Sequence, residues 1–384
     1  MNNSTKVSSA PVKGRLLSLD ALRGFDMLWI TGGGSLIAVL AEWSGTGWLE
    51  TLANQMEHAT WEGFRFYDLI FPLFMFIAGI AIPLSVKSKL ILNVSKKDLI
   101  LKAFKRMMIL IILGFLFNGI FRKGFTDARY ASVLAQIGIA YFFAFVIVVF
   151  SKSFRTSLFW LIGILAGIAC VQLFIPVPGI GAGVLTPEGC INGYIDRLFL
   201  PGRLAYGPDA NMAATGGVFD ALGLLCIVSA IGITLMGTIA GNILQRESLT
   251  EYRKTGILAV IGIALIIVAL LFSPYYPIIK KCWTSTYNLL AGGISFLLIA
   301  LFYLIIDIWH IQKWSFYFRV IGMNAIFIYL LNAIVPVGNV TDAFVGWIIN
   351  PLGDAGKLVH VAGYLAGEWL LLYYMYKKKI FIKV

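Results

Sequence analysis

EHATWEGFRFYDLIFPLFMFIAG, residues 57–79, is the stretch from which the fold of this chain is best predicted. It places His58, Arg65 and Asp68 directly before an apolar run that begins at Leu69. An ionisable side chain at membrane depth is costly to bury and usually has a task. We therefore expect these three residues to lie at the end of a membrane-spanning helix and to form part of a functional site.

Each charged group also has a simpler interpretation. A lone histidine near a membrane surface, such as His58, is more often a solvated or capping residue than a catalytic one. Asp20, Arg23 and Asp26 form a second cluster in the first apolar run and could face the same interior. Asp20 and Arg23 are three residues apart and can pair on one helix face. This pair is either an interfacial anchor or the charged lining of a ligand passage.

The composition indicates an all-α polytopic membrane protein. Of the 384 residues, 59% are hydrophobic and 13% are charged, and the mean hydropathy is +0.85. A soluble domain of this length is far more polar. We expect one transmembrane domain over residues 1–384, because the polar intervals are short except for a long outer loop at 177–217. The net charge of +12 does not indicate nucleic-acid binding, since the basic residues are spread over separate loops.

The apolar runs predict about ten transmembrane helices in one bundle. A hydrocarbon core of about 30 Å requires roughly 20 apolar residues per helix. The expected spans are 20–42, 66–86, 104–121, 131–150, 157–176, 218–242, 256–273, 284–306, 318–338 and 358–376. Residues 1–18 are polar and basic and carry no signal-peptide cleavage pattern, so we expect a cytoplasmic N-terminal tail followed by a retained first span.

The basic residues predict the orientation of these spans. If the N-terminus is cytoplasmic, twenty-one Lys and Arg residues fall in inner segments and nine in outer ones, with Arg23 inside the first span. Short cytoplasmic loops are enriched in Lys and Arg. We therefore expect both termini in the cytoplasm, and we expect the membrane to be a bacterial inner (cytoplasmic) membrane. The basic run from Lys87 to Arg106 indicates contact with anionic membrane lipid, or with an anionic cofactor that arrives from the cytoplasm.

Two outer cysteines leave a question open. Cys190 lies in the long loop and Cys282 in another outer loop, so both are expected to face an oxidising compartment. They either form a disulfide or remain free thiols that are partly buried. The sequence does not decide between these states.

Two further patterns have structural rather than catalytic interpretations. His310 and His360 have no ligand-type neighbours at useful spacing, so we expect no metal site. Gly237 and Gly241 have the small-xxx-small spacing of closely packed membrane helices. The same face would permit a homodimer.

Several motifs in chain order resemble the heparan-alpha-glucosaminide N-acetyltransferase family and its bacterial relatives among the transmembrane acyltransferases. They are RLLSLDALRGF (15–25), EHATWEGFRFYDLIFPLFMFIAG (57–79), RYASVLAQIG (129–138), GYIDRLFL (193–200), FDALGLL (219–225) and GMNAIFIYL (322–330). The family's active histidine, in a His-Ala-Ser/Thr-Trp motif, falls on His58. The resemblance implies transfer of an acetyl group from cytoplasmic acetyl-CoA, across the membrane, to the amine of a glucosamine-like sugar.

The implied reaction suggests roles for individual residues. An amine that attacks a thioester requires a base and donors for the developing oxyanion. His58 is either that base or a nucleophile that carries the acetyl group, and Asp68 is expected to orient its ring. We expect the acetyl-CoA passage to be lined by polar residues of three segments: Asp20, Arg23, Arg129 and Asn324. The outer loop that faces the sugar is expected to be shaped by Asp196 and Arg197.

Two alternatives remain open at this point. The acceptor of the acyl group could be a cell-envelope polymer or a glycolipid instead of a free amino sugar. The protein could also be a solute transporter, because polar residues on interrupted helices also form solute pathways. No internal repeat relates the two halves of the chain, which favours the enzyme.

Overall fold

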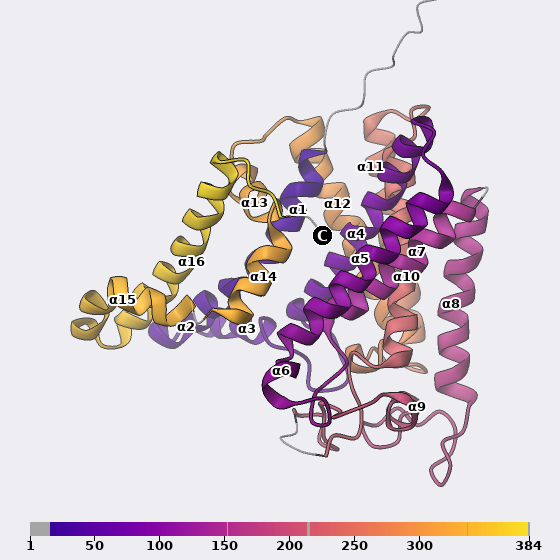
Figure 1. Cartoon of the computed structure of the whole chain (residues 1–384), viewed down its shortest axis with the longest axis horizontal. Coiled ribbons are helices and arrows are strands. Elements are labelled where there is room, and N and C mark those ends of the chain that lie inside the picture. The colour runs from indigo at the N-terminus through magenta and orange to yellow at the C-terminus, as the bar shows by residue number, and fades with distance from the viewer. Residues whose placement is uncertain (1–15, 152, 213–215, 336, 383–384) are drawn as a thin grey trace, which may run out of the picture.

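The structure of the chain, a computed structural model, describes residues 16–151, 153–212, 216–335 and 337–382 (Figure 1). The expected N-terminal tail therefore lies outside the described residues except for residues 16–18. Helices dominate the described chain, and its β-type pairing consists of isolated bridges. The helices are α1 (Leu17–Leu28), η1 (Trp29–Gly33), α2 (Gly34–Ser44), α3 (Gly47–Gln55), α4 (Phe66–Ile91), α5 (Lys96–Phe117), α6 (Ile120–Lys123), α7 (Val133–Phe150), α8 (Phe154–Phe174), α9 (Ile191–Phe199), α10 (Leu224–Leu244), α11 (Glu251–Phe272), η2 (Lys280–Cys282), α12 (Ser285–Tyr303), η3 (Leu304–Ile308), α13 (Ser315–Gly322), α14 (Ala325–Ile334), α15 (Val337–Ile349), η4 (Asn350–Leu352) and α16 (Asp354–Lys377).

Helices α4 and α10 form the centre of the bundle. They pack on each other, and α7, α8 and α12 pack around them, while α11 lies on α12 and α5 on α7. Helix α1 packs on α13. Figure 1 shows α2, α3, α15 and α16 extending to one side of this core. The described part of the chain is thus a helical bundle with a lateral extension.

The expected spans coincide with helices, although fewer of them satisfy a strict test. Seven helices among the described residues are long and apolar enough to cross a membrane, or eight if the bent pair α13 and α14 counts as one span. The two helices of that pair meet at an angle of 70°. Helices α5 and α16 cover the expected spans 104–121 and 358–376 and fall outside this count. The prediction of ten spans therefore remains a prediction.

The glycine triplet of the first span interrupts its helix. The α-helical pattern of α1 changes to a π-helix at Trp29–Gly33 and resumes in α2. Gly32 has φ of 125°, a conformation that residues with a Cβ rarely adopt. The chain therefore requires a glycine here, and the break turns α2 away from the line of α1.

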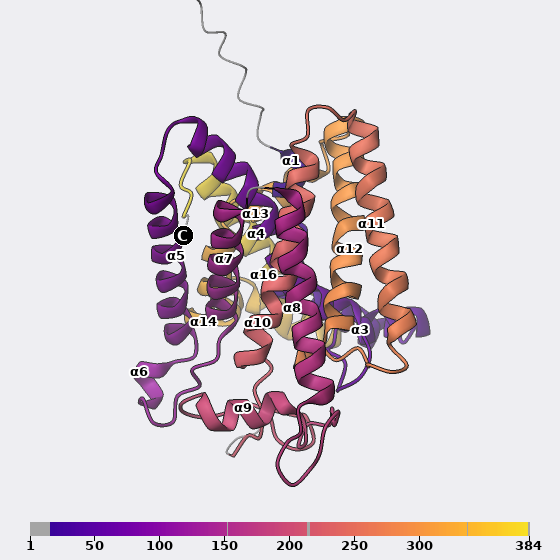
Figure 2. The same cartoon turned by 90° about the vertical axis from the view of Figure 1, so that its right-hand side faces the viewer.

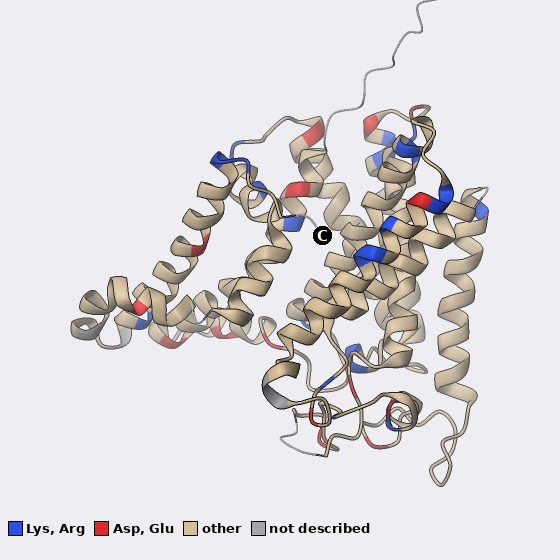
Figure 3. Cartoon of the chain, in the orientation of Figure 1, with Lys and Arg blue, Asp and Glu red and all other residues tan. Residues whose placement is uncertain are grey.

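The basic residues gather at one end of the bundle. Figure 3 shows Lys and Arg concentrated where α4 ends and where α5 and α11 begin, and we call this the basic end. The first turn of α1 and the last turn of α16 lie at the same end (Figure 1). Helix α9 and the described parts of the long loop, residues 177–212 and 216–217, lie at the opposite end (Figure 2). The orientation in which the basic end faces the cytoplasm remains a prediction.

The small-residue spacing on α10 serves packing within the chain. A Cβ atom at Gly237 would lie 2.0 Å from the carbonyl oxygen of Phe76 on α4, and one at Gly241 would lie 2.5 Å from that of Ile80. The predicted packing role is therefore confirmed, with α4 as the partner helix. Because α4 already covers this face, it is not available to a second copy of the chain, and the homodimer remains an untested prediction.

Gly237→Ala is expected to destabilise the bundle by about 1 to 3 kcal/mol, since overpacking a tight interface forces the backbones apart. Gly256→Ala on α11 is the matched control, because a Cβ atom there meets no atom within 4 Å. Thermal unfolding of both variants in detergent checks this expectation. Equal melting temperatures for the two variants would contradict the close approach of α4 and α10.

Candidate active site

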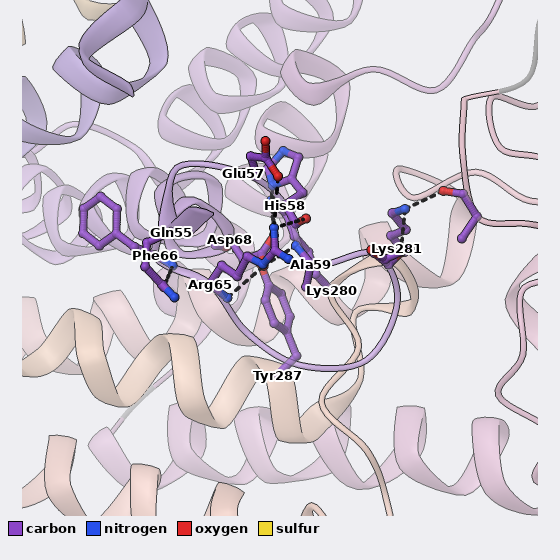
Figure 4. Close-up of polar contacts among 12 residues, drawn as sticks. Gln55, Glu57, His58, Ala59, Arg65, Phe66, Asp68, Lys280, Lys281 and Tyr287 are labelled. Carbon is purple, nitrogen blue, oxygen red and sulfur yellow. Dashed lines mark hydrogen bonds and ion pairs between the residues drawn. The ribbon is translucent and has the colours of Figure 1, made fainter. Parts of the chain in front are cut away.

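His58 and Asp68 meet where the loop after α3 enters α4 (Figure 4). His58 Nδ1 lies 2.9 Å from Asp68 Oδ1. The other carboxylate oxygen, Oδ2, accepts the backbone N–H groups of Ala59 and Arg65, each at 3.1 Å. Asp68 stands in the first turn of α4, where a carboxylate is stabilised by the free N–H groups and by the helix dipole. The loop that carries His58 is thus wrapped around a fully buried carboxylate.

Lys280 completes the group from a distant part of the chain. Its Nζ lies 3.2 Å from Asp68 Oδ1 and 3.0 Å from His58 Nδ1. Tyr287 fixes the same turn from α12, since its hydroxyl donates to the backbone oxygen of Asp68 at 2.8 Å. The sequence analysis did not identify Lys280. The available signal was a pair of adjacent lysines, Lys280 and Lys281, in a loop on the side expected to be poor in basic residues.

The contacts of Asp68 select one tautomer of His58. Nδ1 carries either a proton or a lone pair, so it cannot both donate to Asp68 and accept from Lys280. With the proton on Nδ1, the imidazole and the ammonium group both donate to the carboxylate. With a lone pair on Nδ1, two lone pairs would face each other at 2.9 Å. We therefore assign the proton to Nδ1, which leaves Nε2 of His58 free to accept a proton or to attack an electrophile.

Burial adjusts both basic groups of the site. It lowers the pKa of His58 below its ordinary 6.5, and the positive charge of Lys280 lowers it further, against the opposing hydrogen bond and charge of Asp68. Burial also lowers the pKa of Lys280 to about 8, although Asp68 opposes that shift. At neutral pH His58 is therefore mainly uncharged, while most of Lys280 still carries its proton.

His58 stands at the polar end of a cavity of about 260 Å³. The inner wall is apolar and includes Phe71, Phe74 and Ile137 from α4 and α7. Half of the His58 side chain is exposed, at 49%, so the imidazole is accessible. The ring of Tyr67, another lining residue, lies 4.8 Å from the imidazole ring. A ligand with a long apolar arm and a reactive end fits this cavity, with the arm against the apolar wall and the reactive end at His58.

Arg129 and Lys281 line the same cavity near its mouth. The guanidinium of Arg129 donates to both carboxylate oxygens of Asp220, at 2.8 and 2.6 Å. Lys281 donates to the backbone oxygens of Thr60 and Ala210, and its Nζ lies 5.1 Å from the ring centre of Tyr206. Among the described residues, the cavity lining thus contains three cations, Arg129, Lys280 and Lys281, and no carboxylate, while Asp68 and Asp220 are buried behind it. This favours an anionic group on the bound ligand.

Arg129 is placed differently from the expectation. It lies two turns before Gln136 in sequence, but it precedes α7 and pairs with Gly202 in an isolated bridge, so the two residues do not share a helical face. Gln136 is buried and donates to the backbone oxygen of Cys226 at 3.1 Å. The side chain of Gln136 therefore connects α7 to α10, while Arg129 faces the cavity.

The other residues expected to bind acetyl-CoA do not line the cavity. Asp20 and Arg23 lie on α1, with 3.9 Å between Asp20 Oδ1 and Arg23 Nη1. Asn324 stands at the bend between α13 and α14, where its side chain donates to the backbone oxygen of Ile380 and accepts the backbone N–H of Ile382. Their contacts with the cosubstrate remain predictions.

The two residues expected to face the sugar serve backbone contacts. Asp196 is buried on α9 and accepts the backbone N–H groups of Asp220 and Leu224, at 3.2 and 2.9 Å. Arg197 donates to the backbone oxygen of Val218 at 2.6 Å. These bonds attach α9 to the start of α10. Neither residue lines the cavity, so a role in sugar binding remains a prediction.

The positions of the cysteines and histidines bear on the possible disulfide and on the possibility of a metal site. Cys190 and Cys282 are free thiols that share one small buried cluster with Ile279, so the loops that carry them are in contact. Within the described residues, no group of three or more His, Cys, Asp or Glu side chains is placed to hold a metal ion. His360 lies on α16, where its Nε2 is 3.0 Å from Asp342 Oδ1.

The apolar helices and this cavity define the chain as a polytopic α-helical membrane protein with a histidine, carboxylate and lysine site. Residues 15–176 match a protein family described as a domain of unknown function (DUF5009). Heparan-alpha-glucosaminide N-acetyltransferase of Mus musculus is 27% identical, and the alignment covers 99% of this chain and 62% of that protein. The Homo sapiens protein of the same name is also 27% identical, over 96% of this chain and 60% of its own length. The chain is therefore a distant relative of these proteins and spans about three fifths of their length.

Proposed function

We propose that this protein is a membrane-embedded acetyltransferase. It takes an acetyl group from acetyl-CoA on the cytoplasmic side and transfers it to the amine of a glucosamine-like sugar on the far side of the membrane. The observation that carries the proposal is the contact of His58 with Asp68 and Lys280 at the polar end of an apolar cavity. The alignment of nearly the whole chain with two N-acetyltransferases supports it.

His58 acts through Nε2 by one of two routes. As a general base, Nε2 takes the proton of the acceptor amine while the amine nitrogen attacks the thioester carbonyl, and the thiolate of CoA leaves. As a nucleophile, Nε2 itself attacks the carbonyl and releases the thiolate, and the amine then takes the acetyl group from the imidazole. In both routes Asp68 stabilises the positive charge that develops on the ring.

The cations at the mouth of the cavity would stabilise negative charge that develops during the reaction. The tetrahedral intermediate of either route carries an oxyanion that requires positive charge or hydrogen-bond donors nearby. Lys280 and Lys281 both line the cavity, and both can donate N–H groups to this oxyanion. The apolar wall around Phe74 and Ile137 suits the long arm of acetyl-CoA, with its thioester at His58. Asp20, Arg23 and Asn324 would line the approach from the basic end.

The proposal is tested by incubating the purified full chain with acetyl-CoA and single acceptors while the release of free CoA thiol is measured. Glucosamine is expected to give steady turnover, and N-acetylglucosamine, whose amine is blocked, is expected to give none. Turnover only with hydroxyl acceptors or with a lipid-linked glycan would assign the acyl group to a cell-envelope acceptor. No thiol release with any acceptor would contradict the enzyme and favour a solute transporter.

The turnover number at saturating acceptor is expected to be bell-shaped in pH. The neutral form of His58 is required, so the rate falls as the pH drops through a pKa below 6.5. The protonated form of Lys280 is required, so the rate also falls as the pH rises through about 8. Lys280→Arg, which stays protonated, is expected to lose the alkaline limb. A profile that rises to a plateau in the wild type would remove Lys280 from the mechanism.

A further inference from the structure

A second cavity lies at the basic end of the bundle, away from the active site. Its volume is about 820 Å³. It is lined by the last turns of α7 and α10 and by the first turns of α8 and α11. None of its lining residues lines the cavity that contains His58. The mechanism proposed above makes no use of it.

The polar lining of this cavity consists of hydrogen-bond donors without matching acids. Arg155 and Arg246 both line it, and neither makes an ion pair with a carboxylate in the described part of the chain. Ser151 adds a hydroxyl that is buried and has no hydrogen-bond partner. Ser157 and Asn242 contribute two more polar side chains. Two arginines beside an unsatisfied hydroxyl suit a phosphate group.

Apart from Ser153, the rest of the lining is apolar, which favours the phosphate of a lipid over a soluble phosphate. Phe154 on α8 and Ile257 and Ile261 on α11 form this side of the cavity. On the same two helices, Ile162 and Val260 are exposed, as expected for side chains that face lipid. Figure 2 shows α8 in front of α10, with α11 further to the right, beside α12. A ligand here would meet arginines at one end and two lipid-facing helices at the other.

We propose that this cavity binds the phosphate headgroup of an anionic phospholipid, with the acyl chains between α8 and α11. Basic pockets between helices at the cytoplasmic surface hold such headgroups, because the arginines lie at headgroup depth and the apolar residues lie beside the chains. The site is independent of acetyl transfer. Its failure would therefore leave the proposed function untouched.

The test is native mass spectrometry of the full chain, purified in detergent, with added phosphatidylglycerol, phosphatidylcholine or inorganic phosphate. The wild type is expected to retain one phosphatidylglycerol at concentrations where phosphatidylcholine and phosphate do not bind. The double variant Arg155→Gln, Arg246→Gln is expected to bind phosphatidylglycerol at least tenfold more weakly. Arg253→Gln is the matched control, since Arg253 is an exposed residue in the first turn of α11 that does not line the cavity.

Equal retention of the two lipids by the wild type would overturn the proposal, whatever the variants do. Displacement of phosphatidylglycerol by an equal concentration of inorganic phosphate would assign the site to a soluble anion instead. If Arg253→Gln lost as much affinity for phosphatidylglycerol as the double variant, the effect would be one of general surface charge and not of this cavity. Because the first two comparisons use only the wild-type chain, they remain decisive even if the double variant is poorly folded.

Discussion

His58→Ala is expected to lower the rate of acetyl transfer by about 10² to 10⁴-fold, the usual contribution of a positioned general base. The loss should appear in the turnover number, because Nε2 acts on the reacting atoms and contributes little to ground-state binding. The fold should persist, since the side chain is half exposed, at 49%. Initial rates of CoA release at saturating acetyl-CoA and acceptor measure the effect.

His360→Ala is the control for this prediction. His360 also approaches a carboxylate, with Nε2 3.0 Å from Asp342 Oδ1, but it lies on α16 and does not line the cavity. Its replacement is expected to leave the turnover number unchanged. If His58→Ala kept most of the wild-type rate, His58 would have no part in the chemistry.

Lys280→Met is expected to be the second most damaging change. It removes the ammonium group 3.2 Å from the buried Asp68, and breaking such a pair costs about 3 to 5 kcal/mol because a charge remains buried without its partner. The pKa of His58 should rise, since the positive charge of Lys280 lowers it in the wild type. The acid limb of the pH profile should therefore move to higher pH, and the rate at neutral pH should fall.

Lys281→Met separates this effect from a general loss of charge at the mouth. Lys281 is the next residue, but it donates to the backbone oxygens of Thr60 and Ala210. It should shift the acid limb less than Lys280→Met does. An acid limb that stays in place in Lys280→Met would show that the lysine does not act on His58.

Features formed by residues close together in the sequence could be predicted. His58 and Asp68 are ten residues apart around the start of α4, so a contact between them could be anticipated from the motif, although not its distance. The first helix is interrupted at Gly32, within a run of three glycines of poor helix propensity. Local patterns of this kind are set by backbone preferences that each residue carries with it.

Contacts between distant segments were beyond the sequence. Lys280 reaches His58 from 222 positions further along, where α12 packs against α4 and Glu62 pairs with Ile279 in an isolated bridge. Asp196 and Arg197 were expected to shape the sugar-facing loop, but their bonds go to backbone groups just before and at the start of α10. A charged side chain does not reveal whether its partner is another charge or a backbone group, because the two kinds of bond have similar strength when buried.

Isothermal titration calorimetry of acetyl-CoA against detergent-purified wild type and His58→Ala tests the central claim most directly. We expect both proteins to bind acetyl-CoA with similar affinity, because the cavity wall and the cations are unchanged, while only the wild type turns it over. Absence of binding to either protein would show that the cavity is not an acetyl-CoA site. The relation to the acetyltransferases would then be one of fold, and a solute transporter would become the better description.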